Sequence, residues 1–227
     1  DNELFGDLKK LSAQQGCTIF VTLLAAYSAL LHRLSVQDDL VVGIAAAGQL
    51  SARDNYLVGH CVNLLPLRSV IETTTTFKDY LRFIKMALLD AHEHQAFPLS
   101  KLIQKLNLPW DPSRAPLVST AFNLDYAGPG LDFFELEVVA AINPNSYSKF
   151  DISVNVTQKE KQLVFDCDFN CDLFNPQTVE RWMNHLKILL EGVVLNAEQR
   201  VCELMRTEAA LIHRESIGIG IGRSGTE

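Results

Sequence analysis

The stretch Tyr56–Arg68, Y-L-V-G-H-C-V-N-L-L-P-L-R, decides the fold of this chain. Most of it is an apolar run of aliphatic and β-branched residues, too short for a typical helix and closed by a proline. This pattern predicts a buried strand over Gly59–Leu67. Polar side chains interrupt the run at His60, Asn63 and Arg68. Because a buried amide costs free energy unless it is paired, Asn63 either bonds within the core or faces a cavity through which a substrate passes.

Upstream of this stretch, the apolar spacing predicts two helices and a strand. Asn2–Gln14 places leucines on one helical face, and Thr18 is predicted to cap a longer helix whose apolar repeat continues to Leu34. That second helix is apolar on more than one side, so we expect it to be buried. Leu40–Ala47 is a short apolar run that predicts another strand.

Downstream, helices and strands are predicted to alternate irregularly. The predicted helices are Phe77–Gln95 after a Thr76 cap, Pro98–Leu106, one from Pro176 to about Val193 after an Asn175 cap, and a short one at Met205–His213. The predicted strands are Leu117–Leu124, Phe133–Ile142 and a hairpin of residues 152–156 and 163–169. The class is therefore α/β, with a mixed β-sheet packed with helices in one domain, 1–213. The low-complexity segment 214–227 indicates a linker or an added tail.

Composition limits the classes of function. The chain has 227 residues with a net charge of −7 and 48% hydrophobic residues, values typical of a globular domain and without electrostatic support for binding nucleic acid. No apolar run approaches the length of a membrane span, and no signal-peptide pattern opens the sequence, so we expect no membrane partner and a cytoplasmic location. The 5 cysteines are scattered and odd in number, which favours buried thiols in a reducing compartment.

The residues alone offer no complete catalytic set and no metal site. His60 and Cys61 are neighbours in a predicted strand, so their side chains point to opposite faces and cannot act as a pair. Cys167 and Cys171 lack the second pair of ligands that a zinc site needs. No phosphate-binding glycine loop and no nucleophile elbow is present. What remains is the polar strand and the predicted helix end at His94 and Gln95.

Several segments taken in order resemble the C-terminal lobe of the condensation domain of non-ribosomal peptide synthetases. They are G-C-T-I-F-V-T-L-L-A-A-Y-S-A-L-L-H-R-L, D-D-L-V-V-G-I-A-A-A-G-Q, V-G-H-C-V-N-L-L-P-L-R, H-Q-A-F-P-L, A-P-L-V-S-T-A-F-N-L and K-F-D-I-S-V-N-V, followed by the hairpin leading to D-L-F-N-P-Q-T-V-E-R. Each segment is a weak signal alone, whereas their order and spacing agree over residues 1 to about 210.

The resemblance implies a chloramphenicol-acetyltransferase-like lobe, one of two that enclose a tunnel. Phosphopantetheine arms of donor and acceptor carrier proteins would enter that tunnel, where the acceptor amine attacks the donor thioester and an amide forms. No cofactor would be bound directly. The implied partners are the N-terminal lobe, both carrier proteins and neighbouring synthetase domains. The family signature, two adjacent histidines followed by three residues and Asp-Gly, belongs to the N-terminal lobe and is absent from this sequence.

The resemblance and the strand pattern together give the expected site. Alternation along the strand puts Cys61, Asn63 and Leu65 on one face, which we expect to line the substrate tunnel. Structural or motif roles are expected for Gly59, Arg68, His94, Gln95 and Asp151. No catalytic residue is expected within the chain, so the chain alone is predicted inactive. Two alternatives stay open: a carrier-protein docking module without chemistry, or half of a related ester-forming, heterocyclisation or epimerisation domain.

Overall fold

The computed structural model describes residues 2–47, 59, 61–108, 111–127, 147–160, 162–204 and 219–220. In these residues the helices are α1 Asn2–Gln14, α2 Ile19–Ser35, α3 Phe77–Glu93, α4 Leu99–Leu106 and α5 Pro176–Leu195, with a 3₁₀ turn at Val201–Glu203. The strands are β1 Asp39–Ala47, β2 Val62–Val70, β3 Thr120–Tyr126, β4 Ile152–Gln158, β5 Leu163–Phe169 and β6 Ile219–Gly220. The predicted α/β class with a mixed sheet is confirmed.

The strands form a mixed sheet in the order β2-β1-β3-β4-β5-β6. β1 pairs antiparallel with β2, parallel with β3, and β3 pairs parallel with β4. β4 and β5 form the predicted antiparallel hairpin. β6 pairs parallel with β5 through Phe165 and Ile219, so part of the predicted tail adds to the sheet edge.

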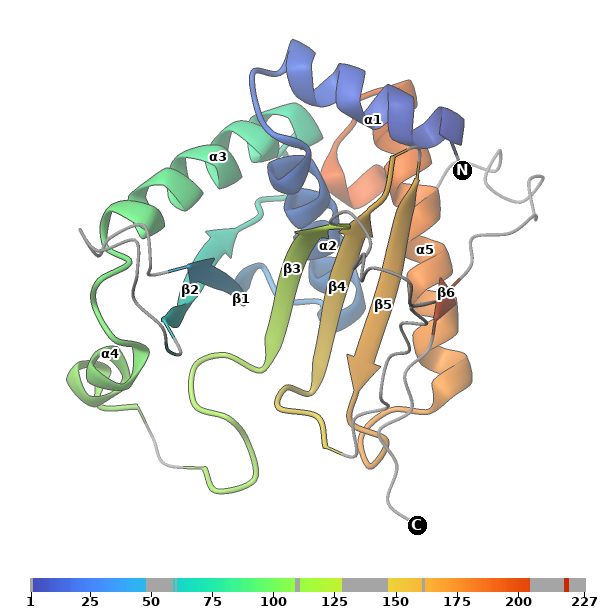
Figure 1. The fold of residues 1–227 in the computed structure, drawn as a ribbon. Helices are drawn as coiled ribbons and strands as arrows, with labels where there is room; N and C mark the ends of the chain where they lie inside the picture. The colour runs from blue at the N-terminus through green and yellow to red at the C-terminus, as the bar shows by residue number, and fades with distance from the viewer. Residues whose placement is uncertain are drawn as a thin grey trace, which may run out of the picture.

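Helix α2 is the centre of the core. In Figure 1 it lies behind the sheet, between α3 on the β2 side and α5 on the β5 side, with α1 across the top. Ten consecutive residues, Val21–Leu30, are buried, as the all-round apolar sequence predicts. The hydroxyl of Tyr27 lies 2.6 Å from that of Thr120 on β3, and the hydroxyl of Thr22 lies 2.7 Å from that of Ser12 on α1, so these buried hydroxyls are paired.

Local sequence signals set most helix ends. Thr18, Thr76 and Asn175 cap α2, α3 and α5, each accepting a bond from a backbone N–H of the first turn. Pro98 was expected to be the first helical residue of α4, but it is the N-cap, with an extended ψ of 137°. The helix predicted to reach Gln95 ends at Glu93, and His94 is its C-cap.

Two strands are shifted relative to the prediction. The strand expected over Gly59–Leu67 begins at Val62 and runs to Val70, because its register with β1 pairs Val70 with Asp39. The strand expected from Leu117 starts three residues later, at Thr120, since Leu117 has a left-handed φ of 69° that no strand residue adopts.

Some predictions lie outside the described residues. These are the strand Phe133–Ile142, the helix Met205–His213 and the placement of His60.

Candidate functional site

The helices α2, α3 and α5 cover one face of the sheet, and the opposite face carries small and polar side chains. Alternate residues of β4, Ile152, Val154 and Val156, are buried toward the helices, while Ser153 and Asn155 between them are partly exposed. The same alternation in β3 and β1 brings further small and polar residues to this outer face: Gly43, Ala45, Ala121 and Asn123. The outer face of the sheet is therefore a surface on which a ligand or another part of the protein could lie.

A pocket of about 620 Å³ lies on this outer face. Its floor comes from β1, β3 and β4, one wall from Val62–Leu64 of β2, and the next from Pro98 and α4. The remaining lining comes from the two segments that precede β3 and β4, through Ala115, Pro116, Val118, Lys149 and Phe150. Such a volume is within the range of small-molecule sites.

Gly43 keeps the pocket floor open. A Cβ at this position would lie 2.6 Å from Cγ1 of Val118 and 3.1 Å from Cδ1 of Leu64. The first distance is shorter than real Cβ contacts, so a larger residue here would force the buried Val118 to shift, and glycine suits the position where β1 passes beneath the pocket.

The polar floor consists of carboxamides on parallel strands. The Asn123 amide nitrogen donates to Oδ1 of Asn155 at 2.9 Å and to a carboxylate oxygen of Asp125 at 3.0 Å. Asn123 and Asn155 are direct neighbours in the register of β3 and β4. Carboxamides both donate and accept hydrogen bonds, so this floor can orient a substrate carbonyl or amine without changing charge.

Asn63 lies at the junction between the two walls. Its amide nitrogen donates to the carbonyl oxygen of Gln95 at 2.8 Å and to that of Phe97 at 3.0 Å. Its side-chain oxygen accepts from the backbone N–H of Leu64 at 3.0 Å. Asn63 is also among the residues that line the pocket. The structure thus joins two features that the sequence presented separately, the polar strand and the helix end at Gln95.

The other residues expected on the tunnel face are placed differently. Leu65 is only 4% exposed and belongs to the helix-facing core, while Val62 and Leu64 line the pocket. Cys61 precedes β2, is half-buried and does not line the pocket. The reason is the pleat: the side chains at 62 and 64 point to the outer face, and those at 63 and 65 point to the helix side. There the Asn63 amide meets the connection between α3 and α4, at the rim of the pocket.

Arg68 lies within β2 and forms an ion pair across the β1–β2 register. Its guanidinium donates two bonds to the Asp39 carboxylate, at 2.9 Å and 2.7 Å. This arginine lowers the pKa of the Asp39 carboxyl below its usual value. Both side chains are mostly exposed, so the pair adds little stability.

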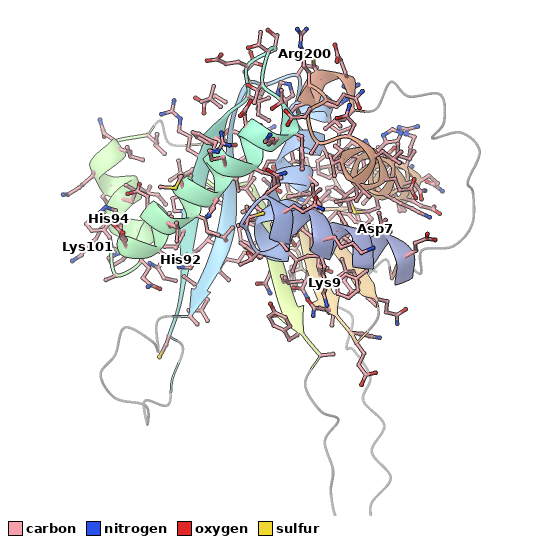
Figure 2. All side chains as sticks on the ribbon, turned by 90° about the horizontal axis from the view of Figure 1, so that it is seen from above. Asp7, Lys9, His92, His94, Lys101 and Arg200 are labelled. Atoms are coloured by element: carbon pink, nitrogen blue, oxygen red, sulfur yellow. The ribbon has the colours of Figure 1, made fainter. Side chains whose placement is uncertain are left out.

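The remaining predicted residues have backbone or surface positions. Gly59 is an exposed bend. His94, the C-cap of α3, is exposed, with Nε2 3.8 Å from the Asp90 carboxylate. Figure 2 shows His92 and His94 at the end of α3 that adjoins α4. Asp151 uses its backbone, donating to Ser119 at 2.8 Å and accepting from Asn170 at 3.0 Å.

Asp151 also lines a second pocket, of about 430 Å³, at one end of the sheet. Its lining is mainly aliphatic and aromatic side chains of α2, β1, α5 and the segment before α5: Leu31, Leu34, Leu40, Val41, Phe174 and Trp182. The rings of Phe174 and Trp182 meet edge to face at 5.2 Å. This pocket contains none of the carboxamide floor, so we take the outer-face pocket as the candidate site.

Burial shifts the pKa of two side chains toward their neutral forms. Burial raises the pKa of the Cys167 thiol to about 12, so it is not a thiolate near neutral pH and is a poor nucleophile. Burial lowers the pKa of His185, with Arg181 and Arg33 contributing, and its buried Nδ1 has no hydrogen-bond partner. Neither residue lines the outer-face pocket, where Lys149 is the one ionisable residue among the described lining residues.

The described residues show neither a metal centre nor a single membrane-spanning helix. Within them, no three His, Cys, Asp or Glu side chains come close enough together to hold a metal ion. No single described helix is both long and apolar enough to cross a membrane, although Glu3–Gln14 and Ile19–Ser35, bent by 103° at the break, together have the length and composition of a span.

Sequence reasoning missed the carboxamide floor and the wall from α4. Asn123 and Asn155 occupy polar positions of alternating strands, a signal that was visible in F-N-L and V-N-V. Only the pairing of β3 with β4, which are distant in sequence, makes these residues neighbours.

Comparison with known proteins gives a consistent family. The family model described as "Condensation domain" matches residues 1–210. The chain is 35% identical over 209 residues to gramicidin S synthase 2 of Aneurinibacillus migulanus, covering 89% of the chain and 5% of that protein. It is 35% identical over 213 residues to tyrocidine synthase 2 of Brevibacillus parabrevis, covering 92% of the chain and 6% of that protein. The chain therefore spans a small part of the relatives it matches.

Solved structures share the fold. A four-domain non-ribosomal peptide synthetase, holo-AB3403 bound to AMP and glycine, superposes with a TM-score of 0.81 at 20% identity, over 89% of this chain and 17% of that one. The condensation domain of the Monacolin K polyketide synthase MokA gives a TM-score of 0.74 at 20% identity, over 88% of this chain and 47% of that one.

Proposed function

The chain belongs to the condensation-domain family of non-ribosomal peptide synthetases, and on that premise we propose that it is the C-terminal lobe of an amide-forming acyltransferase. In the intact protein an acceptor amine attacks the carbonyl carbon of a donor acyl thioester. The new C–N bond forms and the C–S bond breaks, and the donor arm leaves as a thiol that carries the proton lost by the amine. The observation that carries this proposal is the match of residues 1–210 to the condensation-domain model.

The geometry of the outer-face pocket supports a binding role for this lobe. Its lining combines carboxamides, small residues and aliphatic side chains, which can hold a thioester and an amine in place. Among the described lining residues Lys149 alone is ionisable, and no carboxylate or imidazole is available to transfer a proton. Proton transfer or electrostatic assistance would come from the doubled histidine of an N-terminal lobe.

If this lobe binds the reactants and an N-terminal lobe supplies the histidines, the partners of the chain can be named. The N-terminal lobe would complete the tunnel over the outer face of the sheet, and donor and acceptor carrier proteins would deliver their phosphopantetheine arms into it. Neighbouring synthetase domains would lie on the same polypeptide or in the same assembly. The cytoplasmic location predicted from the sequence belongs to this proposal.

Two other functions remain candidates. A non-catalytic docking module would bind carrier proteins at the same lobe, and an ester-forming, heterocyclisation or epimerisation domain would use the same scaffold for other chemistry. Asn123 and Asn155 lie inside the pocket, where they can contact a reactant but not the surface of a docked protein. Their position therefore favours a lobe that orients reactants over one that only docks partners.

The experiment compares the 227-residue chain with the two-lobed protein that contains it, using loaded donor and acceptor carrier proteins. We expect amide product from the two-lobed protein and none above uncatalysed aminolysis from the chain alone, because the chain lacks the histidine pair. Replacing the histidines of the added lobe is the control for background. Turnover by the chain alone, or none by the two-lobed protein, would contradict the proposal.

A further inference from the structure

Strand β2 and helix α4 form adjoining walls of the outer-face pocket, and one side chain connects them. Val62 and Leu64 line one wall, and Leu99 and Ile103 line the other. The Asn63 amide reaches from β2 to the carbonyl oxygens of Gln95 and Phe97, in the connection that leads into α4.

Little else in the described structure holds α4. The helix contains no buried residue, although its sequence is strongly amphipathic. Its N-cap, Pro98, provides no side-chain hydrogen bond to the first turn, and β2 is the element with which α4 makes its main contacts. Figure 1 shows α4 standing apart from the other helices, beyond the end of α3. A helix of eight residues is marginal alone, so it depends on its few contacts with β2 and with the chain at its entry.

Backbone groups hold both ends of the Asn63 carboxamide. Both hydrogens of its nitrogen are used by the two carbonyl bonds, and its oxygen accepts from Leu64. These contacts fix the orientation of the amide and leave its nitrogen no hydrogen for a ligand. We therefore expect Asn63 to act on a bound reactant mainly through the wall that it holds.

We propose that Asn63 is a positioning residue that fixes α4 against β2 and so sets the width of the pocket available to the acyl or aminoacyl group. This inference rests on the proposed function of the lobe. It assigns Asn63 a part in selecting substrates by size. A small displacement of the α4 wall changes the size of the substrate side chain that the pocket can hold.

The first test measures hydrogen exchange of α4 in the 227-residue chain. In Asn63→Ala we expect the amides of Lys101–Leu106 to exchange at least about tenfold faster while those of α2 are unchanged. Asn63→Asp should behave similarly, because a carboxylate cannot donate to the two carbonyls. The matched control is Asn123→Ala, which removes a carboxamide from the same pocket without touching α4. Unchanged exchange of α4 in both Asn63 variants would overturn the proposal.

The second test measures kcat/KM in the two-lobed protein for acceptors that differ only in side-chain size. Asn63→Ala is expected to shift the ratio for bulky over small acceptors by at least about fivefold, and Asn63→Gln, which keeps both donors, to restore part of it. Asn196→Ala, outside the pocket, is the control for general loss. An equal fall in kcat for all sizes would overturn the inference.

The two tests separate the inference from its premise. If the wild-type two-lobed protein makes no amide, the proposed function fails, while the exchange result still decides whether Asn63 holds α4.

Discussion

Helices α2 and α4 differ in how the protein holds them. α2 has ten consecutive buried residues and lies between α3, α5 and the sheet. α4 has none and depends on its entry at Phe97, which Asn63 holds from β2. Burial of apolar area fixes the first helix firmly, whereas a few hydrogen bonds fix the second. The packed core around α2 thus supports a pocket wall whose position depends on a few hydrogen bonds at the entry to α4.

The largest expected effect is loss of core packing. Leu24 of α2 is fully buried, so Leu24→Ala should lower the free energy of unfolding by about 3 kcal/mol through lost transfer energy and an unfilled cavity. Ile103→Ala in α4 should cost less than about 1 kcal/mol, because that side chain lines an open pocket. Urea unfolding of both variants measures the difference, and equal losses would contradict the contrast between the helices.

A smaller effect is expected at alkaline pH, at the contact of α3 with β2. Burial raises the pKa of Tyr80 to about 12, and its hydroxyl lies 2.9 Å from that of Ser69. The pKa of Tyr80 is higher in the folded protein than in the unfolded chain, so above pH about 10 the unfolded chain ionises first. The contribution of neutral Tyr80 to the free energy of unfolding is therefore complete below pH about 10 and is lost as the pH rises toward 12. The free energy of unfolding should fall by about 1 kcal/mol between pH 10 and 11 from this group alone.

Tyr80→Phe is the control for that pH dependence. It should reduce the slope of stability against pH above 10, while Tyr27, whose pKa burial also raises, continues to contribute. An unchanged slope in Tyr80→Phe would show that Tyr80 ionises as freely in the folded protein as in the unfolded chain.

The smallest effect is expected at His94, where α3 ends before α4. The side chain is 77% exposed, so His94→Ala should lower the unfolding free energy by at most about 1 kcal/mol, through lost interaction with the helix end. In the two-lobed protein, turnover per folded molecule should be unchanged. A collapse of turnover with an unchanged melting temperature would assign His94 a role in the chemistry.

Much of the fold was predictable because its signals are local. The boundaries of α1, the caps at Thr18, Thr76 and Asn175, and the β4–β5 hairpin follow from spacing and capping residues. The start of β2 was predicted three residues early, since the apolar run alone cannot say where pairing with β1 begins. The backbone of Leu117 is left-handed, so β3 starts later than predicted, and no sequence pattern indicated that conformation.

The candidate site, like the fold, was predictable only where its signals are local. The sequence by itself determined that Asn63 is a polar group in an apolar strand, and that such a group must find partners. Only the tertiary structure decided that those partners are the carbonyls of Gln95 and Phe97, more than thirty residues away. It also decided that Asn123 and Asn155 meet on one floor. The physical reason is that periodicity and capping act between near neighbours, whereas register and hydrogen bonding between distant segments depend on how the whole sheet assembles.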